Sequence, residues 1–193
     1  MGSIIEAVQL GQIPQTEIAV VIASNPGAPA IEIARSFSVP VAVVDSLSYK
    51  NRRREYDIEL AKELVKHGVT PQEGLVVLAG FMRILGAELV KQYAGRIMNI
   101  HPSLLPSFPG LNAQKQALEY GAKVSGCTVH FVEEGVDTGP IIIQSAVTII
   151  ENEMEETLAA RILEHEHRIY PEAIRYFAEG RMLIDGHRVS IRE

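Results

Sequence analysis

The sequence predicts an α/β fold with an open, mainly parallel, doubly wound sheet and an antiparallel addition in its C-terminal half. Apolar runs of strand length alternate with helical patterns through the first half of the chain, which is the rhythm of a Rossmann-like sheet. The clearest run, residues 74–80, is nearly continuous, as expected of a strand covered by helices on both faces. In the second half two strand-like runs follow one another without a helix between them, which favours an antiparallel pair.

The elements of the first half follow from apolar periodicity and turn residues. The strand at residues 17–23 stops at a turn-forming Ser-Asn-Pro-Gly sequence. The helix at residues 52–67 is the cleanest, because Tyr56, Leu60 and Leu64 recur on one face and a glycine follows it. The expected strands are 17–23, 39–45, 74–80 and 96–100, and the expected helices are 29–37, 52–67 and 87–93.

The second half contains longer strands and one long helix. Cys127, Val129 and Phe131 alternate with Thr128, His130 and Val132, which is the pattern of a strand. Within the long helix, Pro171 is expected to kink the helix or to split it in two. The expected elements are a helix at 113–120 closed by Gly121, strands at 127–132 and 140–150, a helix at 155–179 and a hairpin at 181–191 around Asp185-Gly186.

Composition fits a single globular domain over residues 1–193. Hydrophobic residues make up 47% of the chain and charged residues 22%, while a single cysteine excludes an internal disulfide framework. The formal net charge of −6 argues against a protein that coats nucleic acid or an anionic membrane. No apolar run reaches the roughly 18 residues of a membrane span, and no basic-then-apolar leader opens the chain, so we expect a cytoplasmic protein.

The densest unusual stretch runs from Asn99 to Gly110, Asn-Ile-His-Pro-Ser-Leu-Leu-Pro-Ser-Phe-Pro-Gly. It begins at the end of an expected strand, where open α/β sheets place their ligands. Asn99 and His101 are two residues apart, so in an extended segment they point to the same side. Two N–H donors that converge on one oxygen would form an oxyanion hole. The alternative is a turn in which both side chains only satisfy the local backbone.

A second polar stretch, Val136-Asp137-Thr138-Gly139-Pro140, lies between two expected strands. Asp137 is compatible with a simple turn, because aspartate caps its own backbone. Beside a histidine it would instead keep the imidazole charged. Sequence spacing alone does not bring Asp137 to His101.

The stretch at residues 99–110 resembles the active-site segment of the folate-dependent formyltransferases. The resemblance runs over nearly the whole chain and includes residues 78–85, 136–140, 166–171 and 177–181. It implies formyl transfer from 10-formyltetrahydrofolate to the amino group of glycinamide ribonucleotide in purine biosynthesis. Small-molecule substrates, no metal and no nucleic-acid or membrane partner are therefore expected, and a homodimer is left open.

The resemblance also implies a role for each matching residue. Asn99 and His101 match the groups that stabilise the tetrahedral oxyanion, with His101 protonated, and Asp137 matches the carboxylate that keeps it so. Arg53 matches an arginine that meets the glutamate tail of folate, although Arg52 and Arg54 adjoin it. The residues matched to the pteridine are Met82, Arg83, Ile84 and Leu85 on one side and Glu133, Glu134, Gly135, Val136 and Asp137 on the other, and Glu166 matches a carboxylate on the ribose hydroxyls of the nucleotide.

The chain departs from the sequence pattern of this family at its N-terminus. The resemblance implies a first strand and a Gly-rich turn, which holds the nucleotide phosphate at a helix N-terminus. Residues 1–8 instead resemble the interior of the helix that follows. We expect the first strand to be missing and the domain to be N-terminally truncated relative to the family. A start assigned too late is the explanation we favour over a shortened product with a tag remnant or a true loss of the strand.

Two other functions remain as alternatives. A formyltetrahydrofolate hydrolase would pass the formyl group to water, although the Pro-Ser-Leu-Leu sequence after His101 favours transfer to an amine. A non-catalytic folate-binding protein would keep the folate segments and have lost its nucleotide phosphate loop.

Overall fold

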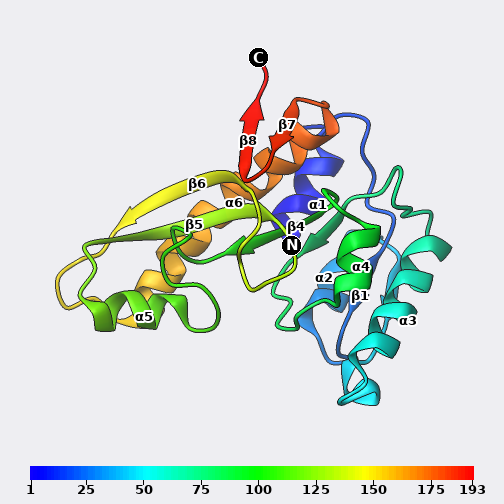
Figure 1. Cartoon of the computed structure of the whole chain (residues 1–193), viewed down its shortest axis with the longest axis horizontal. Helices are drawn as coiled ribbons and strands as arrows, with labels where there is room; N and C mark the ends of the chain where they lie inside the picture. The colour runs from blue at the N-terminus through cyan, green and yellow to red at the C-terminus, as the bar shows by residue number, and fades with distance from the viewer. The chain divides into compact units, whose positions relative to one another are not determined.

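The computed structural model describes all residues from Met1 to Glu193. The chain divides into two compact units, residues 1–97 and residues 98–193, and each is described by itself. Figure 1 labels their helices and strands. The expectation of a single domain over residues 1–193 stays a prediction.

The first unit combines short parallel strands with helices. Strand β1 pairs in parallel with β2, with Val21 opposite Val41 and Ala23 opposite Val43. The backbone N–H of Val76, at the start of β3, donates to the carbonyl of Arg96, just before β4. The elements are α1 (Gly2–Gln9), β1 (Val21–Ala23), α2 (Pro29–Ser36), β2 (Val41–Val43), the 3-10 helix η1 (Ser46–Tyr49), α3 (Arg53–Lys66), β3 (Val76–Leu78) and α4 (Ala87–Gln92).

The core of the first unit is built from apolar residues of its helices and of its short strands. Ile5 of α1, Ala34 of α2 and Val39 form a buried cluster, and Val21 and Val41 pack against it. Helix α2 starts with a proline in its first turn, as expected from the fixed φ of that residue. On α3 the face that carries Leu60 and Leu64 is buried.

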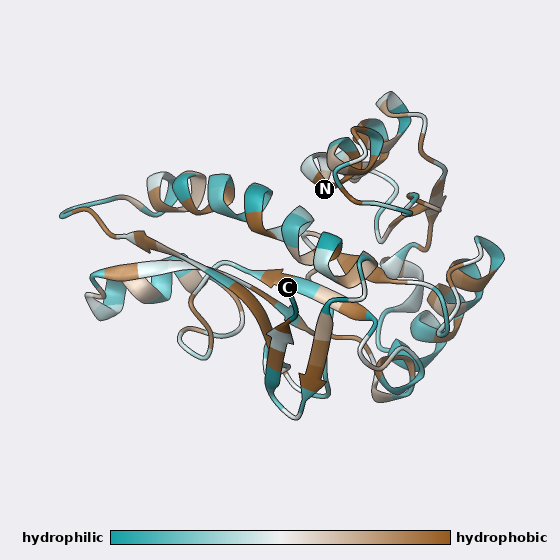
Figure 2. Ribbon diagram, turned by 90° about the horizontal axis from the view of Figure 1, so that it is seen from above, coloured by the Kyte–Doolittle hydropathy of each residue, from teal (hydrophilic) through white to brown (hydrophobic).

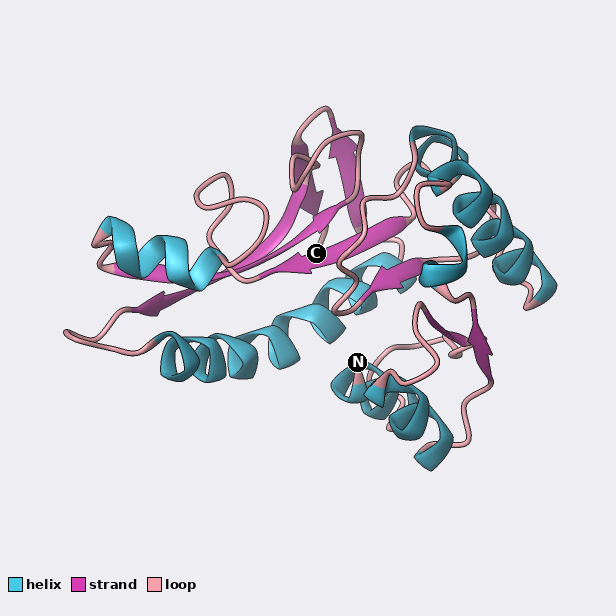
Figure 3. Ribbon diagram, turned by 90° about the horizontal axis from the view of Figure 1, so that it is seen from below, coloured by secondary structure: helices cyan, strands magenta, loops and turns pink.

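The second unit is dominated by two long antiparallel strands and one long helix. The strand order is β4-β5-β6-β8-β7, and β4 pairs antiparallel with β5 and β5 with β6. Helix α6 contacts both β5 and β6 and runs along these strands in Figure 3. The elements are β4 (Ile97–His101), α5 (Ala113–Tyr120), β5 (Val124–Phe131), β6 (Ile141–Thr148), α6 (Glu155–Ala178), β7 (Met182–Asp185) and β8 (Arg188–Ile191).

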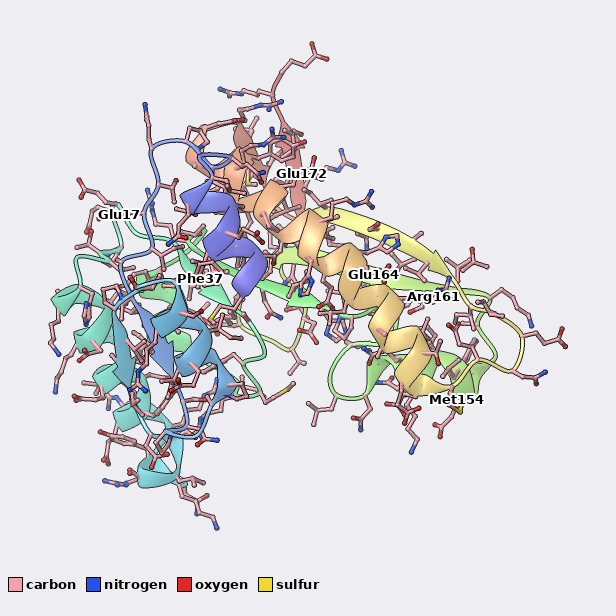
Figure 4. The ribbon with its side chains drawn as sticks, turned by 180° about the vertical axis from the view of Figure 1, so that it is seen from behind. Glu17, Phe37, Met154, Arg161, Glu164 and Glu172 are labelled. Carbon is pink, nitrogen blue, oxygen red and sulfur yellow. The ribbon has the colours of Figure 1, made fainter.

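The amphipathic pattern of α6 explains its place in this unit. Leu158, Ile162, Ile169 and Ile174 are buried on it, while polar residues alternate with them along the helix in Figure 2. Figure 4 follows the same helix from Met154 to Glu172. No helix of the structure is both long enough and apolar enough to cross a membrane.

The fold confirms the α/β class and the antiparallel addition, and it corrects one detail. Pro171 does not split the long helix, which runs unbroken through it. The strand expected at residues 127–132 is part of β5, in which every residue from Ser125 to Phe131 is buried. The alternation thus predicts the strand, whereas its complete burial depends on the elements that cover both of its faces.

Candidate active site

Strand β4 presents the first two candidate residues. Asn99 and His101 are separated by one residue of β4 and so leave the strand on the same side. The antiparallel register places Asn99 opposite His130 and His101 opposite Thr128 on β5. His101 is only 5% exposed. The strand pairing thus builds the site from two neighbouring strands.

The proline-rich loop after β4 folds back onto His101. The imidazole Nε2 of His101 lies 2.8 Å from the backbone carbonyl oxygen of Phe108. Phe108 has a φ of 54°, in the left-handed region that few residues other than glycine adopt. The hydroxyl of Ser103 donates to the carbonyl of Ser107 within the same loop. The loop therefore holds one nitrogen of His101 through its backbone.

The carboxylate of Asp137 faces the other nitrogen of His101. Its Oδ2 lies 3.3 Å from His101 Nδ1 and accepts a 2.8 Å hydrogen bond from the backbone N–H of Gly110. Asp137 itself has a φ of 54°, and left-handed backbone of this kind clusters at functional sites. A side chain on Gly139 would collide with the carbonyl of Phe131, so this turn needs glycine where it returns to the sheet.

His130, on β5, also belongs to this cluster. It is buried, but its Nε2 lies 3.3 Å from Asn99 Nδ2 and 3.7 Å from Asp137 Oδ1. Its Nδ1 lies 2.9 Å from the carbonyl oxygen of Phe131, which assigns the ring proton to Nδ1. Nε2 then accepts from the Asn99 amide. His130 and Thr128 are two residues apart on β5 and therefore share a face of the strand. Thr128 in turn lies opposite His101 on β4.

Burial lowers the pKa of His130, although the nearby Asp137 carboxylate acts in the opposite direction. The imidazole is therefore favoured in its neutral form, which agrees with a lone pair on Nε2 facing the Asn99 amide. His101 differs, because both of its nitrogens face oxygen acceptors and both can hold a proton. The two histidines therefore have different hydrogen-bonding roles.

Thr128 is the centre of a buried network beneath the proline-rich loop. Its hydroxyl donates to the carbonyl of Ser103 at 2.7 Å and accepts from the backbone N–H of Leu105 at 3.0 Å. The side-chain amide of Gln144, on β6, donates both to Thr128 Oγ1 and to the Leu105 carbonyl. Because buried polar groups need partners, this network fixes the loop that contacts His101.

The residues matched to folate in the first unit lie close to one another. The guanidinium of Arg53, at the start of α3, donates to the carbonyl of Leu85. The guanidinium of Arg83 lies over the ring of Tyr56, 4.7 Å from its centroid. Met82 and Ile84 are exposed, whereas Leu85 is buried. The segment of residues 82–85 is therefore attached to the first turns of α3.

The remaining predicted residues lie in the second unit. Residues 133–136 are exposed in the loop that leads to Asp137, after the end of β5. Glu166 is on α6, where burial raises the pKa of its carboxyl group to about 7. None of the hydrogen bonds and ion pairs described for the His101 cluster includes Glu166. No group of three His, Cys, Asp or Glu side chains is arranged to hold a metal ion.

The cluster can move a proton and stabilise negative charge. It contains an amide donor, two imidazoles and one carboxylate, held by backbone groups in a largely buried setting. In such a setting an amide and a charged imidazole stabilise an oxyanion far better than water does, and the imidazole can also act as general acid. The predicted trio Asn99, His101 and Asp137 is thus brought together.

The comparisons with known proteins identify the family of the chain. The family model described as formyl transferase matches residues 1–174. The phosphoribosylglycinamide formyltransferase of Bacillus subtilis is 43% identical over 157 residues, which cover 81% of this chain and 78% of that protein. The trifunctional purine biosynthetic protein adenosine-3 of Drosophila melanogaster is 45% identical over 168 residues, 87% of this chain.

The chain spans 12% of the length of that trifunctional relative. Among solved structures, glycinamide ribonucleotide transformylase 1 from Symbiobacterium toebii superimposes with a TM-score of 0.94 at 49% identity, covering 100% of this chain and 88% of that one. The family match covers most of the chain, including both strands that carry the His101 cluster. The chain therefore belongs to the formyl transferase family.

Proposed function

We propose that the chain transfers the formyl group of 10-formyltetrahydrofolate to the amino group of glycinamide ribonucleotide, a step of purine biosynthesis. The observation that carries the proposal is the buried pair of His101 and Asp137, with Asn99 two residues from His101 on β4. Membership of the formyl transferase family supports the same reaction class. The cytoplasmic location expected from the sequence remains a prediction.

In the proposed reaction, the amine nitrogen forms a bond to the formyl carbon, and the carbonyl oxygen takes up the electron pair as a tetrahedral oxyanion. Collapse of this intermediate breaks the bond to folate N10, which leaves with a proton, while the attacking amine loses one. Asn99 and His101 supply the donors for the oxyanion, and His101 supplies the proton. Asp137 stabilises the charged imidazole through its 3.3 Å contact with Nδ1.

The structure adds one requirement to this mechanism. His101 Nε2 faces the carbonyl of Phe108 at 2.8 Å, so this N–H is engaged by the loop. His101 Nδ1 faces Asp137. For His101 to donate to the oxyanion, Nε2 must exchange the Phe108 carbonyl for the substrate oxygen or share its hydrogen between them. We infer that substrate binding moves the loop around Phe108.

The residues matched to ligands complete the proposal. Residues 82–85 and 133–137 bind the pteridine, Arg53 binds the glutamate tail of folate, and Glu166 binds the ribose hydroxyls of the nucleotide. Exposure of Met82, Ile84 and Val136 supports a role in binding, because large apolar side chains in solvent are available to a flat ring.

Formyl transfer is tested by incubating the chain with glycinamide ribonucleotide and 10-formyltetrahydrofolate and measuring the formylated product. The variants Asn99→Ala and His101→Ala should each lower kcat by about 10²–10³-fold, while His187→Ala, an exposed histidine, should not. A His101→Ala variant with normal turnover would refute the mechanism. Formate released without the nucleotide would identify a hydrolase, and folate binding without either product would identify a binding protein.

A further inference from the structure

The peptide between Leu85 and Gly86 is held at both of its polar groups by side chains of helix α3. The guanidinium of Arg53 donates to the Leu85 carbonyl. The N–H of Gly86 donates to Oδ2 of Asp57 at 2.8 Å. These two backbone groups belong to one planar peptide, and Arg53 and Asp57 are four residues apart on one face of α3. We name this pair of side chains the peptide clamp.

The clamped peptide joins the segment of residues 82–85 to helix α4. Leu85 is the last residue of that segment, to which the proposed function assigns the pteridine, and Gly86 is the N-cap of α4. Helices α3 and α4 are in contact and lie beside one another in Figure 1. Leu85 is buried, while Met82 and Ile84 are exposed. The clamp therefore fixes the buried end of a segment that meets solvent elsewhere.

A further contact attaches the same segment to the first turns of α3. The guanidinium of Arg83 lies over the ring of Tyr56, which is 1% exposed and precedes Asp57 in the chain. Burial raises the pKa of the Asp57 carboxyl group, whereas Arg53 and Arg83 act in the opposite direction. Both guanidinium groups are therefore near enough to stabilise the carboxylate.

Stability alone does not explain a carboxylate at Asp57. The side chain is buried, and the Gly86 N–H is its one hydrogen-bond donor, because Oδ1 has no partner. A buried carboxylate with a single N–H donor loses more hydration than it regains in hydrogen bonds. What the carboxylate does in this structure is to hold the Gly86 N–H in one orientation.

Gly86 fits the clamp because it has no side chain. Its φ of −75° is open to any residue, so backbone conformation does not require glycine here. A Cβ on Gly86 would collide with Oδ2 of Asp57 but would lie 3.9 Å from Arg53 Nε, which is ordinary contact. Alanine at this position would thus push the carboxylate away from the N–H. The clamp can therefore be opened from either side.

We propose that Asp57 is a positioning residue for the folate site, because it fixes the backbone of residues 82–85 through the Gly86 N–H. This inference rests on the proposed function. Asp57 itself contacts neither folate nor the formyl group. Arg53 uses one of its five N–H groups in the clamp, so the others stay available to the glutamate tail of folate. Loss of the clamp should weaken folate binding and leave nucleotide binding unchanged.

The test measures dissociation constants by calorimetry, with tetrahydrofolate and glycinamide ribonucleotide as separate ligands. Asp57→Ala and Gly86→Ala should each raise the dissociation constant of tetrahydrofolate by about tenfold, and that of the nucleotide by less than about twofold. Asp57→Asn, whose amide oxygen still accepts the Gly86 N–H, should stay within about threefold of the parent.

Two variants serve as matched controls and should bind both ligands as the parent does. Glu88→Ala removes an exposed carboxylate of α4 that pairs with Arg54 of α3, but it leaves the clamped peptide untouched. Gly27→Ala adds a Cβ that meets only the Asn25 side chain, at 3.5 Å.

A double-mutant cycle ties the effect to the contact between Asp57 and Gly86. Because either substitution opens the clamp, Asp57→Ala/Gly86→Ala should bind tetrahydrofolate about as weakly as each single variant. Additive losses would overturn the inference, as would parent-like binding in both single variants or equal losses in Asp57→Asn and Asp57→Ala. Equal weakening for both ligands would also overturn it, because it would show a general loss of structure.

The assay of formyl transfer separates this inference from the proposed function. Product formation with an unchanged KM for 10-formyltetrahydrofolate in Asp57→Ala would refute the clamp alone. Selective loss of tetrahydrofolate binding in both clamp variants, with no product formed by the parent, would support the clamp and refute the proposed reaction. A parent that binds no tetrahydrofolate would refute both.

Discussion

Asp137 Oδ2 lies 3.3 Å from His101 Nδ1, although His101 ends strand β4 and Asp137 lies in the loop between β5 and β6. The same oxygen accepts the backbone N–H of Gly110, so the carboxylate ties the proline-rich loop to the histidine. Both groups are largely buried, since 6% of the His101 side chain and 13% of the Asp137 side chain are exposed when the side chains are counted alone. Low exposure strengthens the interaction of the carboxylate with a charged imidazole.

Replacing the carboxylate with an amide tests this relationship directly. Asp137→Asn keeps the size of the side chain and its ability to accept from Gly110, but it removes the negative charge beside His101. We expect kcat for formyl transfer to fall by about 10²-fold or more, because the charged imidazole loses its stabilising partner. Steady-state kinetics would measure this, with Asp185→Asn at the exposed end of β7 as control. An Asp137→Asn enzyme within a factor of about three of the parent would contradict the assignment.

The hydroxyl of Thr128 is expected to position the loop. Thr128→Val has nearly the same shape but leaves the buried Leu105 N–H and Ser103 carbonyl without their partner. We expect the free energy of unfolding to fall by about 1–3 kcal/mol and kcat to fall as the loop shifts. Thr128→Ser, which keeps the hydroxyl, should retain both the stability and the kcat of the parent.

Ser125 offers a matched control for Thr128 on the same strand. Its hydroxyl is buried and has no hydrogen-bond partner, so Ser125→Ala removes no hydrogen bond and should be neutral or slightly stabilising. Urea unfolding and turnover would be measured for all three variants. Equal losses in Thr128→Val and Ser125→Ala would show that the Thr128 hydroxyl has no special role.

Gly139 is expected to tolerate no side chain. A Cβ at this position would collide with the Phe131 carbonyl, so Gly139→Ala must displace the turn that carries Asp137. We expect a loss of turnover that exceeds the loss of stability, because the 3.3 Å contact with His101 is the first to be lengthened. Gly27→Ala, which meets only the Asn25 side chain at 3.5 Å, is the comparison. Unchanged kcat in Gly139→Ala would contradict this account of the turn.

The raised pKa of Glu166 predicts that the free energy of unfolding depends on pH. Burial raises its pKa from the ordinary 4.5 to about 7, so between these values the folded chain holds a proton that the unfolded chain releases. Stability is therefore lost as the pH rises through this window. Glu166→Gln cannot ionise, so it should be more stable than the parent at pH 8, and this difference should shrink towards pH 5.

Urea unfolding of the Glu166→Gln variant and of the parent at pH 5 and pH 8 tests the direction of this stability difference. Glu164→Gln is the matched control, because Glu164 is exposed on the same helix (Figure 4). A stability difference that is the same at pH 5 and pH 8 would show that Glu166 titrates in the folded chain as it does in water.

Much of the fold follows from local patterns. The helix predicted at residues 113–120 agrees with α5, and Gly121 follows it in the left-handed conformation. The predicted hairpin at residues 181–191 agrees with β7 and β8. Both succeed because capping, turn chemistry and periodicity act over a few residues. Burial along β5 could not be predicted in this way, because it depends on elements that pack on both of its faces.

The sequence by itself determined the class of the fold and the placement of Asn99 and His101 on one side of a strand, because residues two apart in a strand point the same way. It also identified Asp137, through its resemblance to a family. Only the tertiary structure decided that Asp137 meets His101, that His130 joins them, and that Thr128 supports the loop from β5. These contacts join residues far apart along the chain. They depend on the β4–β5 register and on the return of the loop through Gly139, which no local pattern encodes.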